Sequence, residues 1–230
     1  MAGVVALYRE YREYLKQQKQ QIAPLQLLGR IEDYLTKEFA GVILRSQESS
    51  VLPVLNVGKK KEERRIDLAL VKGDLSDGVN KKELTVWGLV EVKYLRNRHR
   101  FGKANAEDEH EPTLRSLHKQ LRRLESTDSY ADYAMKLRSG KRDTYGIVFA
   151  SFVDRENEED GAVNGDQFRH KIIQKAKAHG FRTSNFKTPR FYPLYEDYPV
   201  TLLGGKYRVS LHIGLWRLDA DAGCDCGCAV

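Results

Sequence analysis

Two short apolar segments, residues 64–70 and 89–94, carry charged side chains inside patterns that predict strands of a sheet. Successive side chains of a strand point to opposite faces, so Asp67 is expected to stand on the face opposite Leu68. In the second segment Glu91 and Lys93 share one face, and the valines take the other. Charged groups in strands this apolar carry a desolvation cost unless they pair or bind a metal ion.

A predicted helix at residues 24–40 favours a site over a solvated surface. Taken alone, the two segments could be amphipathic strands in which Glu91 and Lys93 form a surface ion pair. Pro24 suits the first turn of the helix. An apolar stripe repeats at helical spacing through Leu25, Leu28, Ile31, Leu35 and Phe39. At roughly 100° per residue, Glu32 falls within this stripe. A carboxylate on the core-facing side of a helix is hard to explain by solvation.

The rest of the pattern continues the alternation of strands and helices. The segment 113–124 predicts an amphipathic helix with Gln120 at the margin of its leucine face. The other predicted elements are a helix within 1–21, an extended segment at 42–46, a strand at 145–152, a helix at 167–179 and a closing hairpin at 200–203 and 207–216. The alternation favours an α/β fold with a mixed central sheet flanked by helices.

In this order of elements the chain resembles the PD-(D/E)xK nuclease superfamily, the restriction-endonuclease-like fold with an αβββαβ core. The resemblance covers about residues 24–153, and the additions are an N-terminal helix and a C-terminal helix plus hairpin. It implies that Asp67 is the first acid of the motif and that Glu91 and Lys93 form its second half. It also implies a catalytic role for the first-helix carboxylate Glu32 and for Gln120. The motif's proline is absent, since Ile66 precedes Asp67.

The implied chemistry is metal-dependent hydrolysis of a phosphodiester. Carboxylate oxygens suit Mg²⁺, and Mn²⁺ is expected to substitute for it. Asp67 and Glu91 would hold the metal together with the main-chain carbonyl of Val92, and Glu32 would hold a second metal or a metal-bound water. Lys93 would orient the attacking water or stabilise the transition state.

The charge of the chain favours a polyanionic partner. The 230 residues carry a formal net charge of +7 at pH 7, and basic residues gather after the second motif strand, on the next helix and before the strand at 145. One such run is usually a solvated face, but three runs around a predicted site favour contact with phosphates. The residues expected to bind nucleic acid are Arg96, Arg98, Arg100, Lys103, Arg115, Lys119, Arg122 and Arg123.

A single domain is expected over residues 1–218, followed by a tail at 219–230 that holds Cys224, Cys226 and Cys228. Three thiols at alternate positions lack the number and spacing of a zinc site, so a reactive tail in a reducing cytosol is the favoured interpretation.

No apolar segment suggests a membrane span or a secretory signal, which predicts a cytoplasmic protein without a membrane partner. The aromatic residues within 186–198 are expected to pack over the core, although such rings could also stack on unpaired bases.

The sequence therefore predicts a Mg²⁺-dependent endonuclease acting on double-stranded DNA, in restriction or DNA processing. A homodimer would place two sites across a duplex. No phosphate-binding loop of the G-x-x-x-x-G-K-[ST] type is found, so no nucleotide cofactor is expected. Two alternatives stay open: a non-catalytic nucleic-acid-binding module of the same fold, and a subunit that cuts only within a larger repair or transposition complex. RNA is also open as a substrate.

Overall fold

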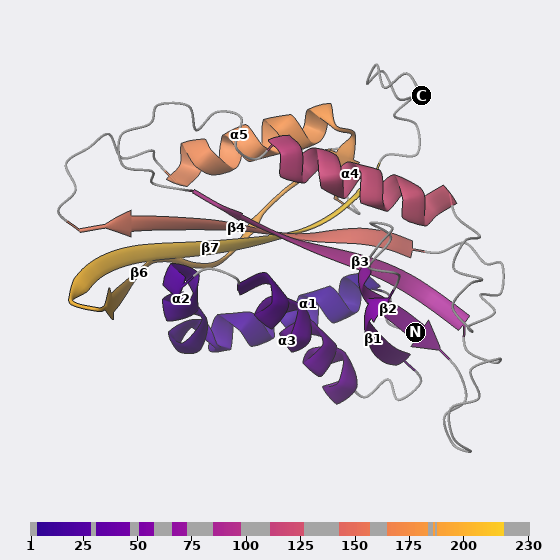
Figure 1. Cartoon of the computed structure of the whole chain (residues 1–230), viewed down its shortest axis with the longest axis horizontal. Helices are drawn as coiled ribbons and strands as arrows, with labels where there is room; N and C mark the ends of the chain where they lie inside the picture. The colour runs from indigo at the N-terminus through magenta and orange to yellow at the C-terminus, as the bar shows by residue number, and fades with distance from the viewer. Residues whose placement is uncertain are drawn as a thin grey trace.

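A mixed sheet with helices on both faces forms the described part of the chain (Figure 1). The computed structural model describes residues 4–28, 31–46, 51–57, 66–72, 85–97, 111–126, 143–156, 165–183, 186 and 188–218. The elements in chain order are α1 (Val4–Gln17), α2 (Lys19–Leu28), α3 (Ile31–Arg45), β1 (Val51–Val57), β2 (Ile66–Lys72), β3 (Thr85–Arg96), α4 (Glu111–Ser126), β4 (Asp143–Arg155), α5 (Gly165–Ala178), β5 (Phe181–Arg182), β6 (Tyr192–Leu202) and β7 (Gly205–Leu218).

The sheet has seven strands in the order β1-β2-β3-β4-β7-β5, with β6 also paired to β7. β3 and β4 run parallel, and the other pairs are antiparallel. Parallel neighbours need a crossover connection, and α4 lies in the segment that joins these two strands. The predicted α/β class with a mixed sheet flanked by helices is therefore confirmed.

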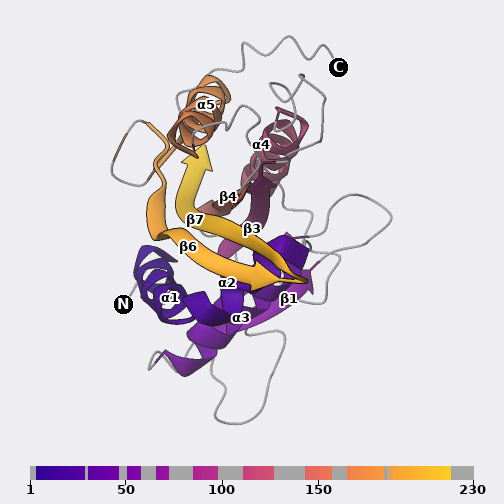
Figure 2. The same cartoon turned by 90° about the vertical axis from the view of Figure 1, so that its left-hand side faces the viewer.

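The sheet separates two apolar layers, with α1, α2 and α3 on one face and α4 and α5 on the other (Figure 2). Alternation along β3 sends Val90 and Val92 into the first layer and Leu89 and Leu95 into the second. Because Glu91 alternates with these valines, its side chain leaves the sheet on the α4–α5 side.

The N-terminal helices differ from the predicted boundaries. Pro24 lies inside α2, so it does not start a helix, and residues 31–40 belong to the separate helix α3. Leu28 is 65% exposed and is not part of the core stripe. The predicted extended segment at 42–46 is wrong, because α3 continues to Arg45. Its apolar face extends through the buried Val42 and Ile43. β-branched residues of this kind also favour strands, so the sequence pattern does not separate the end of this helix from a strand.

The helices predicted at 113–124 and 167–179 and the strand predicted at 145–152 are confirmed, with small changes at their ends. The helix predicted within 1–21 is divided between α1 and α2, and β1 was not predicted. The first strand of the predicted hairpin is longer than expected, because β6 begins at Tyr192, within the aromatic segment 186–198. The closing hairpin of β6 and β7 turns through Leu203 and Gly204, whose φ angles are 50° and 77°. Positive φ at both central residues is typical of the turn that matches the twist of a hairpin. None of the described helices is both long and apolar enough to span a membrane. The cysteine tail lies outside the described residues.

Candidate functional site

The predicted acidic residues meet where β2 and β3 separate. The antiparallel ladder between these strands runs as far as the pair Leu68 and Val90. Beyond that pair β2 continues against β1, whereas β3 continues against β4. Asp67 and Glu91 are the next residues on each strand, and alternation puts both side chains on the α4–α5 face. The diverging strands thus form a fork with a carboxylate on each arm.

The backbone of β3 inside the fork is satisfied by side chains instead of by a strand. The N–H of Val92 donates to Oδ2 of Asp67 at 2.8 Å. Two residues further, the N–H of Tyr94 donates to Oε2 of Glu32 at 2.9 Å. Glu32 lies in the first turn of α3, so a helix from the opposite layer supplies the third carboxylate. Buried N–H groups require acceptors, and these two find theirs in acidic side chains.

Lys93 and Glu91 form the most buried ion pair recorded among the described residues. Nζ of Lys93 lies 2.6 Å from Oε1 of Glu91, and the two side chains are 16% and 2% exposed. The other oxygen of Glu91 accepts a long hydrogen bond of 3.4 Å from the N–H of Asp67. The pair therefore joins both arms of the fork at their base.

The site places three carboxylates beside one ammonium group, and burial raises the pKa of two of these carboxylates. Burial, reinforced by the charge of Asp67, raises the pKa of Glu91 to about 7 even though Lys93 opposes the shift. Burial also raises the pKa of Glu32, again with a contribution from Asp67. Burial on its own would lower the pKa of Lys93, but the carboxylates of Glu91 and Glu32 outweigh it and the pKa is raised. Three carboxylates around one ammonium leave an excess of negative charge that a cation would relieve.

The oxygen atoms that gather at the fork are of the kind that binds hard divalent cations such as Mg²⁺. Carboxylate oxygens from three elements gather at the fork, and the backbone of Val92 faces the same space because its N–H contacts Asp67. The described residues nevertheless contain no group of three histidine, cysteine, aspartate or glutamate side chains arranged to hold a metal ion. Instead, the carboxylates are turned toward backbone N–H groups and toward Lys93. Metal binding at the fork therefore requires that some of these contacts be exchanged.

Gln120 shares the layer of the site but is not joined to it. α4 packs on β3 and β4, on the side of the sheet to which Glu91 and Lys93 point. The amide oxygen of Gln120 is buried and has no hydrogen-bond partner within the described residues. No contact between Gln120 and the carboxylates is recorded, so its predicted catalytic role stays a prediction.

The predicted nucleic-acid-binding residues are placed only in part. Arg115 and Lys119 are exposed on α4, and Arg122 is half-buried on the same helix. Arg96 is half-buried at the end of β3. The predicted contacts Arg98, Arg100 and Lys103 lie outside the described residues, as does the side chain of Arg123.

The sequence pattern did not reveal what holds the distal end of β3. The side-chain amide of Asn97 donates to the carbonyl of Val153, and its oxygen accepts from the N–H of the same residue. Gln26 of α2 is fully buried and donates to Oγ of Ser151 at 2.9 Å, and the carbonyl of Ser151 accepts from the N–H of Asn97. A single buried glutamine in an otherwise amphipathic helix carries no periodic signal, so only the tertiary structure identifies it.

Comparisons of the chain with protein-family models, with curated proteins and with solved structures find no match in any of the three.

Proposed function

We propose that this protein is a Mg²⁺-dependent nuclease of the restriction-endonuclease-like type, in which the fork between β2 and β3 is the active site. The observation that carries the proposal is the convergence of Glu32, Asp67, Glu91 and Lys93 from three separate elements. A charged cluster of this kind is costly to bury, and its charges do not balance.

The order of elements supports the fold part of the proposal. From α3 to β4 the chain runs helix, three strands, helix, strand, which is the αβββαβ order of the superfamily. The acids lie on the second and third of these strands, and the additional carboxylate lies on the preceding helix. Four of the five residues implied by the resemblance therefore lie close together, although they are up to 61 positions apart in the sequence, and Gln120 is the fifth.

The residues divide the chemistry among them. Asp67, Glu91 and the backbone of Val92 would hold Mg²⁺, and Glu32 would bind a second ion or a water molecule. When bound, the metal polarises a phosphoryl oxygen and lowers the pKa of water. Lys93 is anchored by Glu91 at 2.6 Å, so its ammonium would be held beside the phosphate to orient the attacking water. Exposed Arg115 and Lys119 on α4 would contact the phosphates of the bound duplex.

The proposal is tested by incubating purified protein with supercoiled plasmid and with linear duplex DNA, each with Mg²⁺ or with a chelator. Cleavage should require Mg²⁺ and should be lost in Asp67→Ala, while a Glu10→Gln variant, altered at an exposed glutamate of α1, should cut normally. A parallel digestion of duplex RNA identifies the preferred polymer. DNA binding without cleavage under every metal condition would reject the nuclease and favour a binding module of the same fold.

A further inference from the structure

A pocket that mixes arginines with aromatic rings lies on the opposite side of the sheet from the fork. Its walls include Tyr8, Arg9 and Arg12 of α1, Phe186, Tyr192 of β6 and Leu215 of β7. Tyr8 and Leu215 belong to the apolar layer that packs against α1 to α3, whereas Asp67 and Glu91 point to the α4–α5 layer. The pocket is thus separate from the proposed active site.

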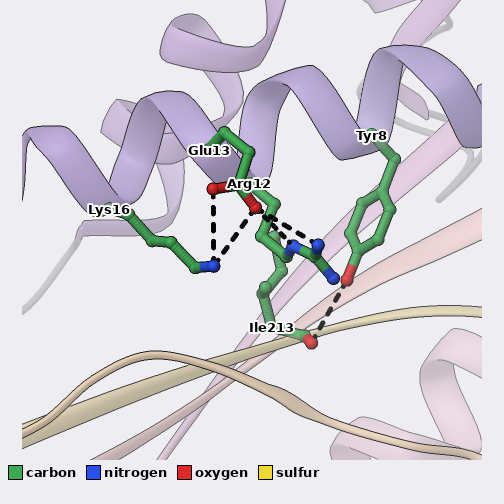
Figure 3. Close-up of polar contacts among 5 residues, drawn as sticks. All are labelled: Tyr8, Arg12, Glu13, Lys16 and Ile213. Carbon is green, nitrogen blue, oxygen red and sulfur yellow. Dashed lines mark hydrogen bonds and ion pairs between the residues drawn. The ribbon is translucent and has the colours of Figure 1, made fainter.

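The floor of the pocket is rigid. The buried hydroxyl of Tyr8 donates to the carbonyl of Ile213 at 3.2 Å and ties α1 to β7 (Figure 3). Leu215 continues the same strand and is itself buried. A site on packed helix and strand residues keeps its shape better than one carried on a loop.

The pocket presents positive charge that its own walls do not neutralise. Arg9 is exposed and has no ion pair within the described residues, and none of the lining residues is acidic. The Arg12 guanidinium contacts Glu13 at 3.2 Å, but Lys16 shares that carboxylate at 3.1 Å (Figure 3). Glu13 therefore offsets Arg12 only in part. Arg9 and Arg12 are three residues apart on one helix, so their guanidinium groups lie on the same face.

Flat aromatic surface lies beside these charges. The guanidinium carbon of Arg12 lies 5.0 Å from the ring centre of Tyr192, and that of Arg190 lies 3.5 Å from the ring centre of Phe186. Phe186 is 40% exposed in spite of this contact, so part of its ring is open to a ligand. Rings and guanidinium planes of this kind stack on nucleobases, and a guanidinium also binds phosphate through paired N–H donors.

We infer that this pocket binds a phosphorylated nucleoside, with the base against Phe186 or Tyr192 and the phosphate on Arg9 and Arg12. The ligand is either a free mononucleotide or one nucleotide of a single strand, since both present the same base and phosphate. This site goes beyond the proposed nuclease function, because it uses none of the residues of the fork.

The test is isothermal titration calorimetry of the full chain in chelator, on an Asp67→Ala background that prevents cleavage. The probes are deoxyadenosine 5′-monophosphate, deoxyadenosine, inorganic phosphate and a short oligodeoxyadenylate. Arg9→Gln, Arg12→Gln and Phe186→Leu should each weaken binding at least tenfold. Arg45→Gln is the matched control, because Arg45 makes a similar contact with Tyr14, at 4.9 Å, away from the pocket. Far-UV circular dichroism confirms that each variant is folded.

Binding of the monophosphate, lost with Arg9→Gln and unchanged in Arg45→Gln, supports the site with a free nucleotide as its ligand. Binding of the oligonucleotide alone, with the same pattern among variants, supports it with a single strand as the ligand. Equal affinity for inorganic phosphate and the monophosphate would overturn the inference, because the rings would then contribute nothing. Affinity that is insensitive to Arg9 and Arg12, or no binding of any probe at about 1 mM, would also overturn it, since even weak specific contacts register there.

Discussion

The buried carboxylate of Glu91 should make the stability of the protein fall as the pH rises. Its pKa is about 7 in the folded chain against 4.5 for an ordinary glutamate, so the folded state binds an extra proton between these values. The resulting stabilisation is complete below the unfolded-state pKa and is lost as the pH rises through the folded-state pKa. For one group with these pKa values, the contribution is about 2 kcal/mol at about pH 5.5 and close to zero at about pH 8.

Glu91→Gln removes this titration. The free energy of unfolding should therefore fall between about pH 5.5 and pH 8 by about 2 kcal/mol more in the natural protein than in the variant. The assay is urea denaturation at both pH values in chelator and at constant ionic strength, with Glu10→Gln as the control. The reasoning would be refuted if the free energy of unfolding changed by the same amount between the two pH values in Glu91→Gln and in the natural protein. It would mean that burial in the fork does not raise the pKa of Glu91.

Two further predictions concern the fold that positions the site. Leu203 is 97% exposed at a φ of 50°, so Leu203→Asn should stabilise the protein by about 1 kcal/mol in thermal or urea denaturation; a lower midpoint would contradict the strain argument. Gln26→Leu should destabilise the protein by about 1–3 kcal/mol because it leaves the buried hydroxyl of Ser151 without its donor. Gln20→Leu, at an exposed position of the same helix, is the control, and equal effects of the two substitutions would show that the buried contact is unimportant.

Strand alternation was enough to predict that Glu91 and Lys93 share one face of their strand and that the neighbouring valines take the other. Apolar neighbours on both sides of Asp67 and Glu91 fix the phase of each strand, and the phase of the helix places Glu32 inward. The structure brings these residues together with Lys93. Alternation does not predict that β2 separates from β3. This separation leaves the N–H groups of Val92 and Tyr94 free to donate to the carboxylates.

The sequence was less informative where tertiary packing decides the structure. Pro24 resembles a helix start, but it is tolerated within α2, and the end of α3 resembles a strand because it is rich in β-branched and apolar residues. The pocket on α1 was also missed as a site. Arg9 and Arg12 have the spacing of any solvated helix face, and only the packing of β6 and β7 brings rings beside them.

The central claim is that Lys93 and the fork carboxylates cleave DNA, and the most direct test separates binding from turnover in Lys93→Ala. Single-turnover cleavage of a labelled duplex with Mg²⁺ is measured beside its affinity in Ca²⁺ for the natural protein, Lys93→Ala and the exposed control Lys37→Ala. Cleavage should fall by at least a hundredfold in Lys93→Ala with little change in affinity, and Lys37→Ala should match the natural protein. Cleavage by Lys93→Ala at the rate of the natural protein would contradict the assignment of the active site to the fork.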